Sequence, residues 1–303
     1  MIQHGIINLN KPVGFTSRQA LDRVKYLLKP LKVGHAGTLD PLAAGVLVVC
    51  LGGATRLIEF VQQQPKRYRA EFLLGRSSAT LDLEGEITEL ENPPIPTADE
   101  LANACRQFIG TIEQRPPDFS AVWVRGQRAY ALARKGREIE IATRPVEVYS
   151  IEIVRYVYPL VELDIQCGSG TYIRSLGRDL AANLGTAAVM SGLVRTAIGP
   201  FNIEDAHDPR NLTLQNVFDT VQPAQFALPD LPQIVLTPEE IDLIAHGQYV
   251  QRDFPPVASL QVAKGEHPFP LCTALDSSGQ MVALLRLRPD QQLGPYISFV
   301  AIS

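Results

Sequence analysis

The sequence predicts a globular protein of two domains, the first mixing strands with helices and the second built mainly of strands. The chain has 303 residues, of which 46% are hydrophobic, enough for about two domains with sizeable cores. Segments of helical and of strand character follow one another through the first 230 residues. Pro223, Pro229 and Pro232 mark a linker, so we expect domains at 1–230 and 231–303.

The N-terminal quarter has the clearest local signals. Gly5–Leu9 has the composition of a short strand, and a Pro/Gly loop follows it. Thr16 and Gln19 fit a capping box, and an apolar stripe at helical spacing continues from there to Pro30, which ends the helix. The run 46–51 is apolar throughout and rich in β-branched residues, so we expect a strand that is buried on both faces.

In the middle and at the end of the chain, charge predicts one loop and periodicity predicts several strands and helices. Residues 82–100 hold seven acidic residues and no basic one and include three prolines, so we interpret them as a solvated loop that faces away from any polyanion. Periodicity predicts two further strands, at 66–74 and 161–167, and we expect the second strand to be half-exposed. It also predicts helices at 101–109, 171–184 and 238–245.

The net charge of −4 conceals an uneven distribution. Residues 1–76 hold eleven Lys and Arg against four Asp and Glu, whereas residues 77–230 hold thirteen against twenty-one and residues 231–303 hold four against seven. Phosphate contacts respond to the local potential, so a mildly acidic protein can still bind a polyanion on a basic face. The composition therefore leaves nucleic-acid binding open.

Cysteine usage and hydropathy argue against several classes of protein. The cysteines at 50, 105, 167 and 272 have no C-x-x-C spacing, so they indicate neither a zinc site nor a disulfide framework, and we expect them to be buried. The longest apolar run, Leu42–Gly53, is shorter than the roughly 20 residues of a membrane span. The N-terminus also lacks the pattern of a signal peptide. We expect a soluble, cytoplasmic protein that binds no membrane.

Asp40 is the candidate catalytic residue. It lies in the turn-forming segment 34–43 (GHAGTLDPLA), directly before the apolar strand, so a loop braced by the core would present its carboxylate. No acidic residue is closer along the chain than Asp22 or Glu59. An ordinary turn is the commoner role of an isolated Asp-Pro pair, and the motifs elsewhere in the chain favour the catalytic role.

Five motifs together resemble one family, the TruB type of tRNA pseudouridine synthase. Each motif is weak alone, but all five stand in the family's order and approximate spacing within residues 5–205. They are KPVG at 11–14, GHAGTLDPLA at 34–43, KRYR at 66–69, GTYIRSL at 170–176, and LVRT at 193–196 followed by GPF at 199–201. The tail resembles the small RNA-binding PUA module of that family through LTPEE at 236–240 and HGQ at 246–248, whereas residues 251–271 depart from its pattern.

The resemblance implies an α+β fold, with a mixed-sheet catalytic domain and a small mainly-β PUA-like domain. It implies isomerisation of the uridine numbered 55 in the T-loop of tRNA, without a cofactor and without a metal. The implied partner is the T-arm of tRNA, bound by a monomer that requires no protein partner. The target base is stacked in a folded loop, so the enzyme would have to extrude it.

The resemblance also implies roles for individual residues. Asp40 would be the catalytic carboxylate, Arg174 its ion-pair partner, and Tyr68 the ring that stacks on the extruded base. Tyr172 would line the same pocket, and Leu193 would close it against water. The plainer alternatives are a helix-surface arginine at 174 and a half-buried strand tyrosine at 68.

Three further features follow from the same resemblance. His35 would contact RNA where nucleotides have been extruded, although a lone histidine is more often structural. Lys11 would brace the active-site loop, and a phosphate contact for it is left open. Val194 stands where a second arginine is common in the family, so a phosphate contact is weakened there. Residues 123–144, with six basic residues, Trp123 and Tyr130, correspond to an RNA-contacting insertion, against the alternative of a solvated helical hairpin.

Several alternatives stay open. A glycosidase also attacks an anomeric carbon, but it needs two carboxyls, and no motif brings a second acid to Asp40. A guide-RNA-dependent synthase of ribosomal RNA shares the motifs but usually has a longer basic tail than 295–303. A non-catalytic tRNA-binding or tRNA-folding module would not need Asp40. The residues also leave the role of the carboxylate open between a nucleophile at C1′ or at C6 and a base that removes a sugar proton.

Overall fold

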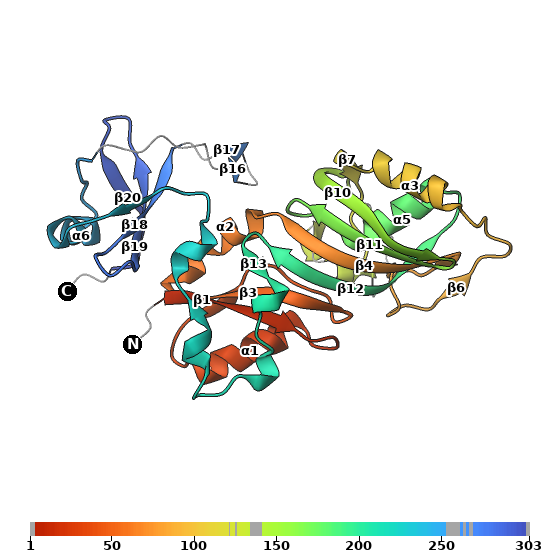
Figure 1. Cartoon of the computed structure of the whole chain (residues 1–303), viewed down its shortest axis with the longest axis horizontal. Helices are drawn as coiled ribbons and strands as arrows, with labels where there is room; N and C mark the ends of the chain where they lie inside the picture. The colour runs from red at the N-terminus through yellow and green to blue at the C-terminus, as the bar shows by residue number, and fades with distance from the viewer. Residues whose placement is uncertain are drawn as a thin grey trace.

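The computed structural model describes residues 4–120, 122–124, 126–133, 141–252, 261–262, 265–266 and 269–300. A long twisted sheet crosses most of the molecule, and a small C-terminal sheet lies at one end of it (Figure 1). Helices α3 (Ala98–Gln107) and α5 (Ile173–Asn183) pack on the far half of the long sheet, and α1 (Ser17–Leu27) covers the near half.

Within the described residues, the long sheet has ten strands in the order β14-β1-β3-β12-β4-β11-β10-β7, with β2 on β3 and β13 on β12. Strands β3 and β12 run parallel, whereas the other neighbours are antiparallel, so the predicted mixed sheet is confirmed. The bounds are β1 His4–Lys11, β2 Val33–His35, β3 Ala43–Gly52, β4 Lys66–Leu74, β7 Gly110–Gln114, β10 Arg144–Val157, β11 Leu160–Cys167, β12 Ala188–Ile198, β13 Phe201–Asn202 and β14 Val221–Gln222.

The parallel contact between β3 and β12 joins the two halves of the long sheet. Leu193 of β12 lies opposite Ala43 of β3, and Arg195 lies opposite Gly45. Gly45 has a φ of +101°, and a Cβ atom there would come within 2.2 Å of the Arg195 carbonyl oxygen, so only glycine fits. One hydrophobic cluster packs against β4, β10 and β11, and two further clusters lie on the two faces of β1 and β3. The functional site described below lies where these two halves meet.

Local signals predicted several elements correctly. Thr16 caps α1 in a reciprocal capping box with Gln19, and Ala20 and Val24 are fully buried against the sheet. The apolar run 46–51 is the buried centre of β3. The strand predicted at 66–74 and the helix predicted at 238–245 have the predicted bounds. The remaining helical bounds are α2 Ile58–Gln63 and α4 Ala129–Ala133, with 3₁₀ turns at Gly53–Leu57, Ile203–Asp205, Pro209–Asn211, Val217–Thr220 and Ala224–Ala227.

Two predicted helices begin at other residues. The helix predicted at 171–184 begins at Ile173, because Tyr172 is extended, with φ −96° and ψ 111°. The helix predicted at 101–109 begins at Ala98, because Thr97 and Glu100 form a second capping box that the sequence interpretation missed. Glu100 therefore belongs to a helix and not to the acidic loop. The rest of that segment contains only the short strand β6, Thr88–Glu89, which pairs with β5, Arg76–Ser77.

The C-terminal part forms a four-stranded sheet in the order β15-β18-β19-β20, with α6 (Pro238–Ala245) beside it. Its strands are β15 Gln233–Val235, β18 Leu271–Leu275, β19 Met281–Leu287 and β20 Leu293–Ser298, and a separate pair is β16 Gln261–Val262 with β17 Gly265–Glu266. Leu284 and Phe299 pack in one cluster with Ile6 and Phe60 of the first part. The domain boundary near residue 230 stays a prediction.

Two expectations from composition can be compared with the described residues. The thiols of Cys50, Cys105, Cys167 and Cys272 are all buried, as predicted, and burial raises the pKa of each of them. No helix in the described ranges has the length and apolar character to cross a membrane.

Candidate active site

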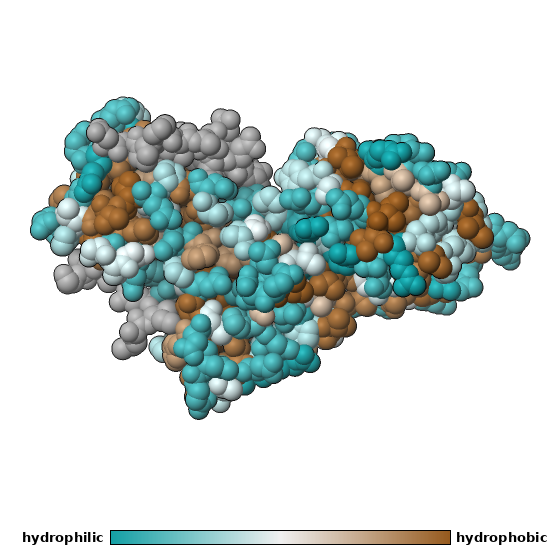
Figure 2. Space-filling model, viewed as in Figure 1, coloured by the Kyte–Doolittle hydropathy of each residue, from teal (hydrophilic) through white to brown (hydrophobic). Residues whose placement is uncertain are grey.

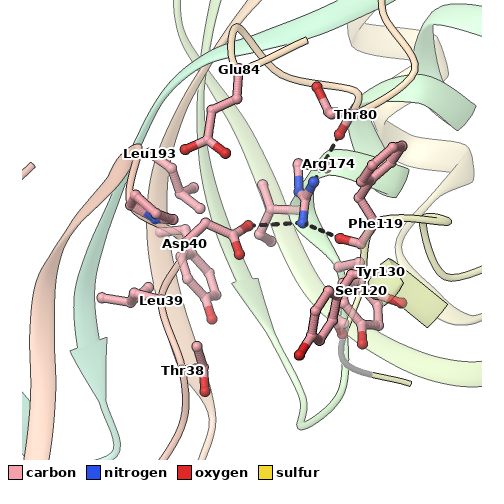
Figure 3. Close-up of a pocket in the computed structure, with 15 residues that line it drawn as sticks. Thr38, Leu39, Asp40, Thr80, Glu84, Phe119, Ser120, Tyr130, Arg174 and Leu193 are labelled. Atoms are coloured by element: carbon pink, nitrogen blue, oxygen red, sulfur yellow. Dashed lines mark hydrogen bonds and ion pairs between the residues drawn. The ribbon is translucent and has the colours of Figure 1, made fainter. Parts of the chain in front are cut away.

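A cavity of about 670 Å³ lies where the two halves of the long sheet meet. The loop after β2, strands β4 and β12 and the beginning of α5 surround it (Figure 3). Five of the seven site residues suggested by the sequence line this cavity, although they come from four separate segments. The lining residues are Thr38, Leu39, Asp40, Pro41, Tyr68, Thr80, Glu84, Phe119, Ser120, Tyr130, Thr171, Tyr172, Ile173, Arg174 and Leu193.

The loop that presents Asp40 is fixed by hydrogen bonds on both sides. The buried Ser17 hydroxyl of α1 accepts a hydrogen bond from Leu39 N at 2.8 Å and donates one to Leu39 O at 3.0 Å. Gly14 N donates to Pro41 O at 2.8 Å. The backbone around the candidate carboxylate is therefore held in place, while the Asp40 side chain stays 40% exposed and faces the pocket.

Arg174 orients the Asp40 carboxylate. Its Nη2 lies 2.9 Å from Asp40 Oδ2, which is the ion pair that the resemblance implied. The same guanidinium donates to Thr80 O at 2.8 Å and to Phe119 O at 3.1 Å (Figure 3), and its Nη1 lies 3.2 Å from Asp82 Oδ2. The Arg174 side chain is 8% exposed, so it is not the helix-surface arginine of the alternative interpretation.

Asp82 corrects the interpretation of the acidic segment 82–100. It is 1% exposed, and its Oδ1 accepts hydrogen bonds from Thr80 Oγ1 at 2.6 Å and from Glu84 N at 3.1 Å. The segment therefore begins inside the site and not in solvent. A buried carboxylate needs a cation, and Arg174 provides it. Nothing local in the sequence points to this pairing, because the two residues are far apart in the chain.

Glu84 corrects the view that Asp40 is the sole carboxylate of the site. It lines the same cavity, and Figure 3 shows its side chain reaching toward Asp40. Burial raises the pKa of the Glu84 carboxyl, and the negative charges of Asp82 and Asp40 raise it further. The argument against a glycosidase from a missing second acid is therefore wrong, since a second carboxyl is present in space.

Tyr68 and Leu193 lie on the neighbouring strands β4 and β12. Tyr68 is 8% exposed and Leu193 is 9% exposed, and both line the cavity. Burial raises the pKa of the Tyr68 phenol, partly opposed by the charge of Arg195, so the ring is neutral near pH 7. The two side chains provide an apolar floor with one flat ring, which suits an aromatic ligand.

Tyr172 lines the cavity from the turn before α5. Its backbone is held on both sides by Gln114, whose Oε1 accepts from Tyr172 N at 2.8 Å and whose Nε2 donates to Tyr172 O at 3.2 Å. The guanidinium carbon of Arg144 lies 5.2 Å from the centre of the Tyr172 ring. Tyr130, from the predicted insertion 123–144, also lines the cavity.

The predicted insertion is described only in part. It contains the short hairpin β8 (Trp123–Val124) and β9 (Gln127–Arg128), followed by α4. Residues 134–140 of this segment lie outside the described residues, as do 253–260, 263–264 and 267–268 of the C-terminal segment that departs from the family pattern. RNA contact by the insertion stays a prediction.

Lys11 and His35 do not line the cavity. Lys11 is fully buried, and its Nζ donates to Phe15 O at 2.5 Å and Pro12 O at 3.0 Å, so it braces the loop after β1. Burial lowers the pKa of Lys11 to about 8, against the opposing effect of the Asp40 charge. This geometry does not favour the phosphate contact that was left open. His35 is half-buried on β2, and burial and the charge of Arg195 lower its pKa.

Arg195 is a site-supporting residue whose role the sequence interpretation missed. It is 3% exposed, and its guanidinium donates to Val46 O at 2.8 Å and to Gly37 O at 3.2 Å. Gly37, with a φ of +118°, opens the turn toward Asp40, so Arg195 ties this turn to β3. Among the described residues, no group of three His, Cys, Asp or Glu side chains is placed to hold a metal ion.

Sequence comparisons agree with the motifs. The profile of the TruB family pseudouridylate synthase (N-terminal domain) matches residues 25–173. The tRNA pseudouridine synthase B of Dehalococcoides mccartyi is 42% identical over 248 residues, which cover 80% of this chain and 83% of that protein. The tRNA pseudouridine synthase B of Moorella thermoacetica is 38% identical over 299 residues, which cover 94% of each chain.

Two similar solved structures support the fold. A chain of a Cbf5-Nop10-Gar1 complex matches with a TM-score of 0.71 and 25% identity, covering 99% of this chain and 86% of that one. A chain of an H/ACA RNP bound to a substrate RNA containing 2′-deoxyuridine matches with a TM-score of 0.71 and 24% identity, covering 100% of this chain and 87% of that one. Together with the relatives of about 40% identity, these findings establish that the chain belongs to the TruB family of pseudouridine synthases, which are isomerases of uridine in RNA.

Proposed function

We propose that this enzyme converts uridine 55 in the T-loop of tRNA to pseudouridine, without a guide RNA, through base flipping and the carboxylate of Asp40. The ion pair between Asp40 and Arg174 at 2.9 Å carries this proposal, because it orients a carboxylate in the wall of a cavity that also contains Tyr68. The relatives named tRNA pseudouridine synthase B support tRNA as the substrate class. A cytoplasmic location would follow from that substrate.

The reaction is an isomerisation that needs no external reagent. The bond from N1 of uracil to C1′ of ribose breaks, the base turns, and C5 forms a new bond to C1′. The proton on C5 leaves to the solvent, and N1 gains one. Asp40 acts as a nucleophile at C1′ or at C6, or removes a sugar proton, and each of these routes requires it to be ionised and close to the sugar.

The pocket residues suggest how the flipped base is held. The ring of Tyr68 would stack on the uracil, and such a contact contributes on the order of 1–3 kcal/mol, which offsets much of the cost of unstacking the base. Leu193 would exclude water from the sugar side, and Tyr172 would close the cavity from the beginning of α5. His35, half-buried next to the Asp40 turn, would contact the RNA loop.

We further propose that the protein acts as a monomer on the T-arm, with residues 231–303 as a PUA-like RNA-binding domain and residues 1–230 as the catalytic domain. The similar solved structures come from assemblies with RNA or with other proteins, so guide-dependent action is the second candidate function. The relatives of 38–42% identity favour stand-alone action, because they carry the name of a tRNA enzyme.

One assay tests the function and its alternatives. A T-loop transcript with tritium on C5 of uridine is incubated with the wild-type protein and with Asp40→Asn, and tritium release is measured. We expect release by the wild type and none by the variant. Equal release by both would refute the role of Asp40, and release that requires an added guide RNA would favour the ribosomal enzyme. Binding of tRNA with no release by either would favour a non-catalytic module.

A further inference from the structure

The exposed side of α1 carries a row of positive charges. Arg18 and Lys25 are seven residues apart, which brings them to one side of α1, and Lys29 lies in the turn after the helix. Lys32 comes next, directly before β2. All four side chains are exposed, and we call them the α1 basic surface.

Carboxylates neutralise little of this charge. Residues 17–32 hold five basic residues and one acidic residue, Asp22, which pairs with Arg18 at 2.9 Å. Across the part of the chain that the structure describes, no carboxylate lies within ion-pair distance of Lys25, Lys29 or Lys32. Lys29 Nζ lies 5.3 Å from the centre of the Tyr26 ring, which is itself 64% exposed. The surface therefore offers free ammonium groups to a polyanion.

Helix α1 is also tied to the active site. Its first residue, Ser17, makes both hydrogen bonds to Leu39, next to Asp40. Arg18 directly follows Ser17 in α1, so the α1 basic surface starts one residue from this contact. The α1 basic surface thus begins beside the residue that holds the Asp40 turn and continues along α1, and the part of the molecule that contains α1 is largely hydrophilic in Figure 2.

The end of the long sheet that lies away from α1 carries exposed carboxylates. Glu86 and Glu91 are exposed around β6, which Figure 1 shows at the far end of the long sheet from α1, whereas Glu89 is paired with Arg76 at 2.9 Å. A polyanion whose loop enters the pocket would be repelled on that side and attracted on the α1 side.

We propose that the α1 basic surface binds the sugar-phosphate backbone of the double-helical stem that adjoins the target loop. The inference rests on the proposed function, since it requires an RNA substrate whose loop occupies the pocket. Lysine ammonium groups meet phosphates as point charges, so this contact contributes affinity and orientation but no base specificity. It adds a second binding region that acts on the stem, apart from the residues that hold the flipped base.

The test compares two double variants that remove the same charge. Lys25→Gln/Lys29→Gln alters the α1 basic surface, and Arg106→Gln/Arg155→Gln alters exposed arginines on α3 and β10. For a T-arm hairpin with its full stem, we expect the lysine variant to bind about tenfold more weakly at moderate salt, with a salt slope shallower by about 1 to 2 and kcat unchanged. The arginine variant should match the wild type within about twofold.

A hairpin with the same loop and a shortened stem completes the test. We expect the lysine variant and the wild type to bind it equally. Equal weakening by both double variants, or no weakening by the lysine variant, would overturn the proposal, and so would equal weakening on the short and the full stem. Failure of the proposed function is seen separately, because the wild type would then convert no uridine in either RNA.

Discussion

Asp82 and Arg174 form a buried ion pair at 3.2 Å behind the exposed carboxylate of Asp40. Arg174 therefore has two anionic partners, of which Asp82 is 1% exposed and Asp40 is 40% exposed at the side chain. The buried partner offsets the cost of keeping the guanidinium out of water, while the exposed partner remains available to a ligand. We infer that Asp82 is a positioning residue that fixes the guanidinium, which in turn fixes Asp40.

Asp82→Asn should lower kcat with little change in KM. The amide keeps the shape but loses the charge that holds Arg174, and hydrogen bonds to charged groups contribute about 1.5–3 kcal/mol, which corresponds to a roughly 10- to 100-fold lower rate. Single-turnover tritium release measures the effect. Glu86→Gln is the matched control, because it neutralises an exposed carboxyl of the same loop that does not line the cavity and has no ion pair with Arg174 among the described residues. An equal loss in both variants would contradict the role of Asp82.

Ser17→Ala should slow the reaction by about tenfold while substrate affinity is retained. The change leaves Leu39 N and Leu39 O without their partner beside Asp40, at a cost of about 0.5–1.5 kcal/mol for each hydrogen bond. Thr16→Ala is the control, since it removes the cap of the same helix without touching Leu39. Steady-state kinetics at a temperature where both variants are folded separate kcat from KM. A larger rate loss in Thr16→Ala would mean that only helix stability matters.

Tyr68→Ala should lower kcat/KM on folded tRNA by roughly 10- to 100-fold, because stacking on the extruded base contributes on the order of 1–3 kcal/mol. Tyr68→Phe keeps the ring and should retain most of that contribution. Circular dichroism checks that both variants are folded, since Tyr68 is part of the core cluster. Unchanged kinetics in a folded Tyr68→Ala protein would eliminate the stacking proposal.

The buried Lys11 should make stability depend on pH. Burial lowers its pKa in the folded protein to about 8, below the 10.5 of an exposed lysine, so the folded state carries a penalty below pH 8 that is relieved as the pH rises to about 10.5. Lys11→Met removes this dependence, and its stability relative to the wild type should fall by about 3 kcal/mol between pH 7.5 and pH 10.5. Urea unfolding of both proteins at the two pH values measures it. A constant difference would show that Lys11 is not buried as a cation.

Local patterns predicted the elements whose signals lie within a few residues. Helix α1 begins at the capping box of Thr16 and Gln19, and α6 begins at a proline followed by acidic residues. Each of these signals acts within one helical turn, so the sequence contains the complete signal. The apolar run 46–51 predicted a strand that is buried on both faces, because no polar residue interrupts it.

Only the site residues that belong to recognised motifs could be predicted from the sequence. Asp40, Tyr68, Tyr172, Arg174 and Leu193 belong to motifs, and the fold brings all five to one cavity. Asp82, Glu84 and Arg195 take part in the same site without a local signal. Asp82 even belongs to a segment whose composition indicates a solvated loop.

The sequence by itself determined which segments form helices and strands and which carboxylate stands in a turn before a buried strand, because these depend on neighbours along the chain. Only the tertiary structure decided which charges meet. The parallel contact of β3 with β12 and the packing of α5 bring Asp40, Asp82 and Arg174 together from three distant segments. Ion pairs depend on the distance between the charged groups in space and on their burial, and the spacing of residues along the chain gives neither quantity.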